Sequence, residues 1–327
     1  MRTRKLGAAG PEITAVGFGA WAIGGPWRFG WGSVDDDESV RAIRHSIESG
    51  INWVDTAAVY GLGHSEEVTG RALEPYAVGE DVYVFTKCGQ NWLDATGDQP
   101  INDLRPNSIR FECDQSLKRL GVERIDLYQF HWPDDATGTE VEDSWGTMSE
   151  LIVQGKVRWG GVSNFDVDLL ERCNRIRRVD SLQPPLSLIN RRARNDVIPW
   201  CDDNGTGVIV YSPMHSGLLT GKYTQESIAE LEDGDWRKRA ADFKEPRLTR
   251  NLDLVARLEQ IATRLDTTLP VLVVAWAIAT DGVTGAIVGA RRPEQVDGWL
   301  PAGDLRLSDA AMAEIEDAIA GSGAGEG

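Results

Sequence analysis

The chain has 327 residues, and its 51 acidic and 34 basic side chains give a net charge of -17 at pH 7. This charge opposes broad attraction to nucleic acid or to an anionic membrane surface. No apolar run reaches the roughly 18 residues that a membrane span needs, and the N-terminus lacks the apolar segment of a signal peptide. We therefore expect a cytoplasmic protein without nucleic-acid or membrane partners.

The cysteines and histidines form no recognisable metal-binding pattern. The four cysteines are Cys88, Cys113, Cys173 and Cys201, and the four histidines are His45, His64, His131 and His215. They show neither CxxC nor HExxH spacing, so we expect buried or incidental thiols, no disulfide framework and no metal site.

Short apolar runs alternate with amphipathic helical segments along most of the chain. The predicted strands are residues 15–19, 51–55, 82–87, 125–131, 158–163, 181–186, 207–213 and 285–290. Clear helical periodicity lies between them, for example in residues 37–50, 107–121 and 166–178. Eight such units favour a closed (β/α)8 barrel over an open doubly wound sheet.

Three segments lie outside the eightfold pattern. Residues 4–16, with a Gly-Pro turn signal, predict a hairpin across one end of the barrel. Residues 224–250 form a long polar segment of a kind that is usually functional or disordered. We expect the small-residue tail, 321–327, to be disordered. The chain shows no internal repeat or linker, so we expect a single domain spanning 1–327.

Titratable side chains stand where the second, third and fourth predicted strands end. Asp55 ends the second strand and Tyr60 follows it, Lys87 ends the third, and His131 ends the fourth. In this fold the catalytic groups come from the carboxyl ends of different strands.

These four residues make chemical sense together. The Lys87 ammonium would lower the pKa of the Tyr60 phenol, and Asp55 would hold Lys87 in place. His131 would orient a substrate oxygen, to which Tyr60 gives a proton as hydride arrives. Taken singly, each residue has an ordinary alternative: Asp55 as a helix cap or turn former, Lys87 as a solvated lysine at a strand end, His131 as a hydrogen-bonded core or rim histidine, and Tyr60 as a packing residue.

The segments "DTAAVYG", "TKCG" and "QFHWPD" resemble the signatures of the aldo-keto reductase family, and the resemblance covers nearly the whole chain. It is nearest to the bacterial general-stress and inositol-utilisation branch, which shares the "GKY" segment. The resemblance implies a (β/α)8 barrel, NADPH as hydride donor, and Asp55, Tyr60, Lys87 and His131 as the catalytic tetrad with Tyr60 as proton donor.

No GxGxxG follows a strand, so the sequence offers no Rossmann site. The resemblance implies instead a cofactor that lies extended across the barrel mouth. The matching positions for the nicotinamide carboxamide are Ser163, Asn164 and Gln183, whose amide and hydroxyl groups suit it. Tyr211 matches the ring that stacks on nicotinamide. A segment from Ser212 through Gly217 and Leu218 to Lys222 matches the pyrophosphate-binding stretch. We also place Gly19, Ala20, Trp21 and Asp55 among the cofactor-binding residues.

The adenosine end is matched by Gly289, Arg291 and Gln295. Arg291, beside Arg292, would bind a 2′-phosphate, which favours NADPH over NADH. Many relatives have a Glu-Asn pair where this chain has Gly298 and Trp299, so Trp299 either stacks on adenine or packs. Arg237 and Lys238 align with a loop that folds over the cofactor.

Aromatic side chains near the predicted strand ends suggest an apolar substrate pocket. The candidates are Trp21, Trp27, Phe29, Trp31, Tyr60, Trp92 and Trp132. Trp53, Trp159 and Trp276 lie inside predicted elements, and we interpret them as structural. Aromatic rings suit small carbonyl compounds, sugar faces and polycyclic ligands alike, so the composition selects no substrate.

The resulting hypothesis is a reversible NADPH-dependent reductase of aldehydes and ketones, monomeric or homo-oligomeric. An alternative is a nicotinamide-binding regulatory subunit with little turnover, resembling potassium-channel β-subunits; those relatives replace the tetrad histidine, which this chain retains as His131. A metal-dependent barrel hydrolase would need ligands that the sequence does not provide.

Overall fold

The computed structural model describes residues 1–93, 99–232 and 235–325. Its centre is a closed barrel of parallel strands in the order β10-β11-β12-β3-β4-β5-β8-β9. These strands are β3 (Val16–Gly19), β4 (Trp53–Asp55), β5 (Tyr83–Cys88), β8 (Ile125–Phe130), β9 (Val157–Ser163), β10 (Ser181–Gln183), β11 (Gly207–Val210) and β12 (Gly285–Gly289). Each falls within or overlaps one predicted strand, which confirms the (β/α)8 barrel.

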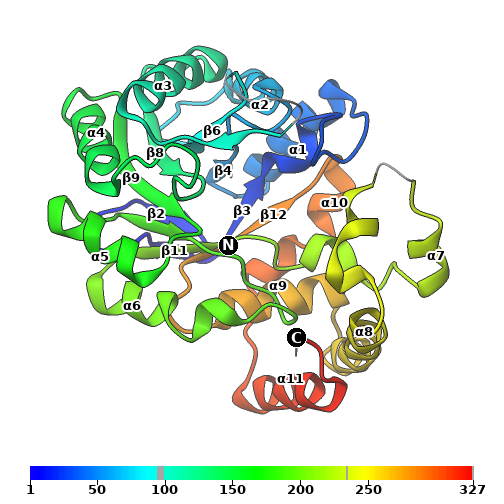
Figure 1. Ribbon diagram of the computed structural model, residues 1–327. Helices are drawn as coiled ribbons and strands as arrows, with labels where there is room; N and C mark the ends of the chain where they lie inside the picture. Colours follow the sequence, from blue (N-terminus) through cyan, green and yellow to red (C-terminus); the bar gives the residue numbers. More distant parts are fainter. Residues whose placement is uncertain (94–98, 233–234, 326–327) are drawn as a thin grey trace.

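Helices surround the barrel (Figure 1). They are α1 (Asp36–Glu48), α2 (His64–Leu73), α3 (Pro106–Leu120), α4 (Val141–Val153), α5 (Val167–Ile176), α6 (Val197–Asn204), α7 (Gln225–Ala229), α8 (Arg247–Arg264), α9 (Leu269–Ala279), α10 (Pro293–Asp297) and α11 (Asp309–Ser322). The three clearest helical predictions correspond to α1, α3 and α5. Their ends follow local chemistry: the Asp35 carboxylate caps α1, and Gly121 ends α3 in a left-handed conformation.

Side chains along each barrel strand alternate between the interior and the helices. Trp53 and Phe85 belong to the cluster inside the barrel, whereas Val54 and Val84 pack in the outer core with the helices. Because a strand repeats every two residues, the interior positions after Trp53 and Phe85 are Asp55 and Lys87. Asp55 and Lys87 therefore both point into the barrel, one layer closer to the carboxyl ends of the strands than the interior apolar cluster.

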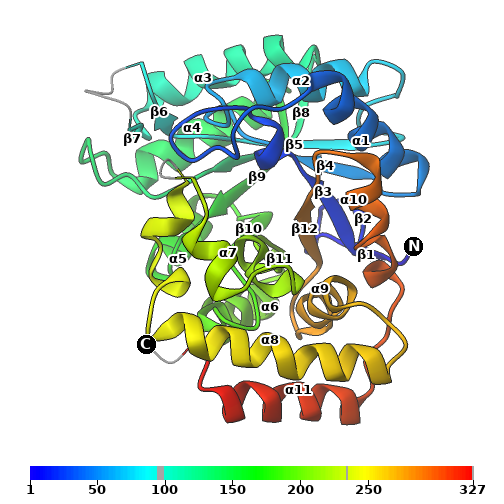
Figure 2. The same cartoon turned by 90° about the vertical axis from the view of Figure 1, so that its right-hand side faces the viewer.

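The predicted N-terminal hairpin closes the end of the barrel at which the parallel strands begin. Strands β1 (Thr3–Lys5) and β2 (Glu12–Thr14) pair antiparallel, and Leu6 and Ile13 complete the interior apolar cluster. The short hairpin of β6 (Gln90–Asn91) and β7 (Ile101–Asn102) lies at the opposite end, the mouth (Figure 2). Because apolar side chains fill the hairpin end of the barrel, the polar interior side chains lie towards the mouth.

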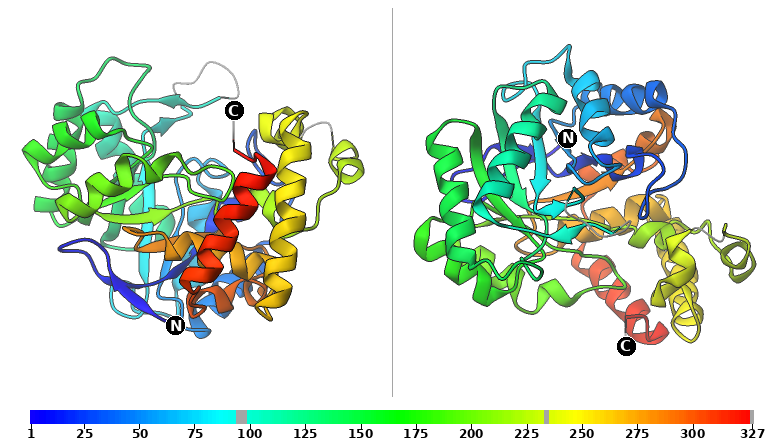
Figure 3. Two further views of the ribbon diagram at one scale, coloured as in Figure 1. Left: turned by 90° about the horizontal axis from the view of Figure 1, so that it is seen from below. Right: turned by 45° about the horizontal axis from the view of Figure 1, so that its top comes forward.

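The long segment 224–250 contains α7 and two short 3-10 helices, η4 (Trp236–Arg239) and η5 (Ala241–Phe243). Helix α7 stands away from the barrel (Figure 3). We call residues 235–243 the strap, because they run beside the loop that follows β3. Residues 233 and 234 lie outside the described part of the chain.

The C-terminal tail differs from the prediction of disorder. Helix α11 packs beside α8 and continues to Ser322, and Ala324 is fully buried (Figures 2 and 3). The Arg191 guanidinium donates to the Ala324 carbonyl, and Gly323 supplies the left-handed helix end. These contacts order residues 321–325 despite their small side chains; residues 326 and 327 lie outside the described part.

The other sequence expectations concern thiols, metals and membranes. All four cysteines are buried and unpaired. In the described residues, no group of three or more His, Cys, Asp or Glu side chains is placed to hold a metal ion. No single described helix has the length and apolar composition of a membrane span; α8 and α9 reach it only as a pair bent by 92°.

Candidate active site

The four candidate catalytic side chains meet at the mouth end of the barrel. Lys87 Nζ lies 2.5 Å from Asp55 Oδ1 and 2.9 Å from the Thr56 carbonyl, and it donates a longer hydrogen bond of 3.4 Å to the Tyr60 hydroxyl. The rings of Tyr60 and His131 stand edge to face, 5.6 Å between centroids. Lys87 is 1% exposed and Asp55 is 3% exposed. The ends of three strands thus bring the four side chains together.

The glycine-rich turn after Tyr60 sets the position of its ring. Gly61 has a φ of +62°, and a Cβ there would meet the Gly24 carbonyl oxygen at 1.8 Å. Only glycine fits this left-handed, closely packed position. The turn brings the chain from Tyr60 to the start of α2 at His64, so the ring stays at the mouth instead of joining the helix.

The second carboxylate oxygen of Asp55 is also occupied. Gln183 Nε2 donates to Asp55 Oδ2 at 2.9 Å, and Gln129 Nε2 donates to the same oxygen at 3.2 Å. Buried carboxylates persist where such donors replace water. Asp55 is therefore held by one ammonium and two amides.

The pKa of Tyr60 changes in the direction opposite to the prediction. Burial raises the pKa of the Tyr60 phenol well above 10, and the Asp55 carboxylate raises it further. The predicted lowering of this pKa is wrong for this structure, because burial and the Asp55 carboxylate both act in the opposite direction. Tyr60 is consequently a protonated phenol at neutral pH, a form that can give a proton.

Burial lowers the pKa of both His131 and Lys87. Burial, and then the nearby Lys87 charge, lowers the pKa of His131 well below 6.5, so its imidazole is neutral at physiological pH. Burial also lowers the pKa of Lys87, while the contact with Asp55 opposes that change. The neutral His131 ring is suited to hydrogen bonding with a carbonyl oxygen and not to carrying charge.

The three residues expected at the nicotinamide carboxamide lie together at the carboxyl ends of β9 and β10: Ser163 and Gln183 end these strands, and Asn164 follows Ser163. Asn164 Nδ2 donates to the His131 carbonyl and to Ser163 Oγ, both at 3.0 Å, and Tyr211 OH donates to Asn164 Oδ1 at 2.8 Å. Ser163 Oγ donates to the Gln183 carbonyl at 2.8 Å. The N–H and O–H groups of Ser163, Asn164 and Gln183 are thus used in hydrogen bonds within the protein. These residues therefore offer a ligand mainly acceptor oxygens, which match the N–H groups of a carboxamide.

The strap is joined to the loop after β3 by aromatic rings. Trp236 lies 5.8 Å from Trp21 and 6.2 Å from Trp31, and Trp21 and Trp31 are 5.4 Å apart. Arg237 stands 4.7 Å over the Trp31 ring and pairs with Asp235. Arg237 is 7% exposed, so it acts through this packing more than as a free cation.

The expected pyrophosphate stretch is held in an unusual backbone conformation. Its left-handed residues are Ser212, His215, Ser216, Gly217 and Gly221. Leu218 is fully buried, whereas Lys222 is exposed.

His215 links this stretch to the strap. Its Nδ1 lies 3.0 Å from Ser187 Oγ and its Nε2 lies 3.0 Å from Asp242 Oδ2. Ser187 Oγ already accepts from the Ile189 and Asn190 amides, so its proton points to Nδ1 and the Nε2 proton points to Asp242. These residues line a cavity of about 210 Å³ next to Tyr211.

The residues expected at the adenosine end lie beside β12. Gly289 pairs in register with Gly19, which is followed by η1 (Ala20–Ile23). The Arg291 amide donates to Gln295 Oε1 at 2.7 Å, and its guanidinium donates to the Trp31 carbonyl at 3.2 Å. Trp299 is 2% exposed and packs in the outer core, so of the two alternatives packing is the one observed.

The expected pocket aromatics do not all face the tetrad. Trp27 lies 6.5 Å from the Tyr60 ring and 5.5 Å from Phe29. Trp132 is 40% exposed, and the Trp92 ring stands 6.0 Å from the Arg119 guanidinium. Of the expected pocket aromatics, Trp27 lies beside Tyr60, and Phe29 packs on Trp27.

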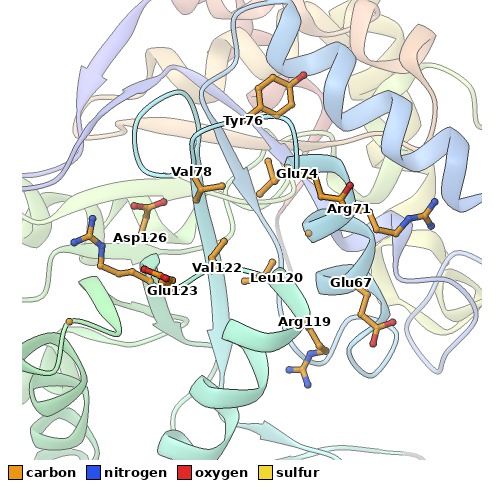
Figure 4. A pocket seen from close by; sticks show the side chains of 15 residues that line it. Glu67, Arg71, Glu74, Tyr76, Val78, Arg119, Leu120, Val122, Glu123 and Asp126 are labelled. Carbon is orange, nitrogen blue, oxygen red and sulfur yellow. The ribbon is translucent and has the colours of Figure 1, made fainter.

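A separate groove of about 910 Å³ lies away from the tetrad (Figure 4). Its lining includes Glu67 and Arg71 from α2, Arg119 at the end of α3, and Asp126 from β8. Its charges are mixed in sign, and none of the four candidate catalytic side chains reaches it. The chemistry is therefore assigned to the mouth.

Comparison with known proteins identifies the family. The model of the aldo/keto reductase family matches residues 15–320. The chain belongs to the aldo/keto reductase family. Among its relatives, aldo-keto reductase YhdN of Bacillus subtilis is 35% identical over 91% of this chain and 87% of its own. The NADH-specific methylglyoxal reductase of Escherichia coli is 32% identical over 98% and 99%.

A solved structure agrees with this membership. The glycerol dehydrogenase AKR11B4 from Gluconobacter oxydans is 34% identical, covers 98% of this chain and 95% of its own, and superposes with a TM-score of 0.87. As a member of the aldo/keto reductase family, the protein is an oxidoreductase that acts on small-molecule carbonyl compounds with a nicotinamide cofactor.

Sequence reasoning missed three contributors to this aldo/keto reductase site. Gln129 contacts Asp55, His215 links the expected pyrophosphate stretch to the strap, and Trp236 packs on Trp21. Gln129 could have been found from the strand alternation, because it lies two residues after the inward-facing Leu127. His215 and Trp236 had no comparable signal, since their partners are distant in the sequence.

We predict that His215→Leu speeds release of the nicotinamide cofactor. The substitution removes the hydrogen bonds to Ser187 and Asp242, which at about 1–2 kcal/mol corresponds to release roughly 5- to 30-fold faster. Stopped-flow displacement of NADPH, followed by its fluorescence, measures this rate. His45→Leu is the matched control, because His45 pairs with Asp297 on the outer surface at 2.7 Å. Equal release rates for the two variants would contradict the role of His215.

Proposed function

We propose that this protein is an NADPH-dependent reductase of small aldehydes and ketones, with Tyr60 as the proton donor and Asp55, Lys87 and His131 as its catalytic partners. One observation carries the proposal: the Tyr60 hydroxyl lies 3.4 Å from Lys87 Nζ, which is itself paired with Asp55 at 2.5 Å. We further propose that the protein works in the cytoplasm, in keeping with its charge and composition.

The bound nicotinamide would supply the hydride. Tyr60 would place its O–H on the carbonyl oxygen, and the neutral His131 imidazole would hold that oxygen from the side. As the phenol gives up its proton, the growing negative charge on Tyr60 faces the Lys87 ammonium. Lys87 would thereby act late, on the phenolate, and not by acidifying the resting phenol.

The proposed cofactor preference rests on charge near the adenosine end. Arg291 is positioned by Gln295 and by the Trp31 carbonyl, and Arg292 is its neighbour in sequence. Two guanidinium groups suit a 2′-phosphate, which only NADPH carries. A relative that is named NADH-specific makes a direct comparison of both cofactors necessary.

We predict that Tyr60→Phe lowers the rate of carbonyl reduction by on the order of 100- to 10,000-fold, because the proton donor is lost, while NADPH binding changes little. Nicotinamide absorbance measures the rate with methylglyoxal and with 4-nitrobenzaldehyde, using NADPH and NADH in parallel. Tyr83→Phe serves as control, since Tyr83 packs on Trp159 away from the tetrad.

Reduction by Tyr60→Phe at the wild-type rate would overturn the role of Tyr60. An NADH rate equal to or above the NADPH rate would overturn the cofactor preference.

We also predict a distinct pH dependence for the two directions. Because burial raises the pKa of Tyr60 well above 10, the phenol stays protonated, and reduction should be constant between about pH 6 and about pH 9. Alcohol oxidation needs the phenolate and should rise about tenfold per pH unit over the same range. Steady-state kcat in both directions tests this. A reduction rate that falls across neutral pH would show that Tyr60 ionises far lower than its burial implies.

A further inference from the structure

Gln129 is a buried amide that the proposed chemistry does not use. It lies on β8 inside the barrel, is 0% exposed, and is paired in register with Lys87. Its Nε2 donates to Asp55 Oδ2 at 3.2 Å, and its Oε1 accepts from Gln183 Nε2 at 3.1 Å. A buried amide without such partners would cost folding free energy, so its position is specified.

The chemistry of Asp55 decides which way both amides face. An ionised carboxylate only accepts hydrogen bonds, so Gln129 and Gln183 must each turn an NH2 group towards Asp55. Gln183 then spends one proton on Asp55 and the other on Gln129 Oε1. Both of its donor positions are filled.

This leaves one group of Gln183 for a ligand. In the described part of the chain, no donor engages Gln183 Oε1. Gln183 can therefore accept a hydrogen bond from a cofactor carboxamide but cannot donate one to it. The second of these hydrogen bonds depends on Gln129. Without Gln129 Oε1, the second Gln183 N–H has no acceptor among the described residues and is free to donate to the cofactor.

We propose that Gln129 is a positioning residue that commits Gln183 to accepting, so that the site selects a pyridine ring bearing an N–H donor at its 3-position. This inference rests on the proposed function, since it concerns the same cofactor site. It assigns Gln129 a role in recognition through Gln183, not in contact with cofactor or substrate.

Three oxidised cofactors separate this role from simple packing. NADP+ carries a carboxamide, its thionicotinamide analogue keeps the N–H donor, and its 3-acetylpyridine analogue has only a carbonyl. Dissociation constants come from quenching of tryptophan fluorescence, which requires no turnover. For the wild-type protein we expect similar affinity for NADP+ and the thio analogue, and about tenfold weaker binding of the acetyl analogue.

Two substitutions of Gln129 make opposite predictions. Gln129→Met removes the acceptor for Gln183, so the preference for NADP+ over the acetyl analogue should fall from about tenfold towards one. Gln129→Glu keeps an acceptor at that place and should retain the preference, even if catalysis suffers from a second carboxylate beside Asp55. Gln129→Glu preserves shape and acceptor, so loss of the preference in this variant would overturn the role of Gln129 even if Gln129→Met fails to fold.

The outcomes are distinguishable. If the wild-type protein bound none of the three dinucleotides, the proposed function itself would fail. If it bound them without preference, or if Gln129→Met kept the wild-type preference, the cofactor site would stand and the role of Gln129 would be overturned. A preference lost in Gln129→Met and retained in Gln129→Glu supports the proposal.

Discussion

The buried contact between Lys87 and Asp55 is the interaction on which the rest of the site depends. Lys87 is 1% exposed and Asp55 is 3% exposed, so both charges are removed from water inside the barrel. A buried ion pair is costly unless hydrogen bonds replace its hydration. Thr56 supplies a carbonyl to Lys87, and two glutamine amides serve Asp55. The polar groups around the pair at the barrel mouth thus replace the hydrogen bonds that Lys87 and Asp55 would make to water.

Strand geometry explains how much of this arrangement the sequence could predict. Eight apolar runs with helical segments between them gave the barrel, and side chains at three strand ends gave Asp55, Lys87 and His131. The same alternation that turns Trp53 and Phe85 inward turns Leu127 inward, and thus Gln129 two residues later. Gln129 was therefore visible in the pattern, but a glutamine carries no catalytic signature of its own.

The remaining features depend on distances that sequence order does not supply. The pKa of Tyr60 rises because the phenol is largely removed from solvent and because the Asp55 carboxylate lies nearby. Ser187, His215 and Asp242 form one chain of hydrogen bonds although they are spread over 56 positions of sequence. The ordered tail similarly depends on Arg191, far from the C-terminus.

A double-mutant cycle between Asp55 and Lys87 tests the central claim most directly. Asp55→Asn, Lys87→Met and the double variant are compared in the rate of hydride transfer during a single turnover. If the two residues act as one unit, each single change slows the step by on the order of 100-fold or more, and the double variant is little slower than the worse single variant. Multiplicative effects of the two changes would contradict the account, because they would mean that Asp55 and Lys87 act independently.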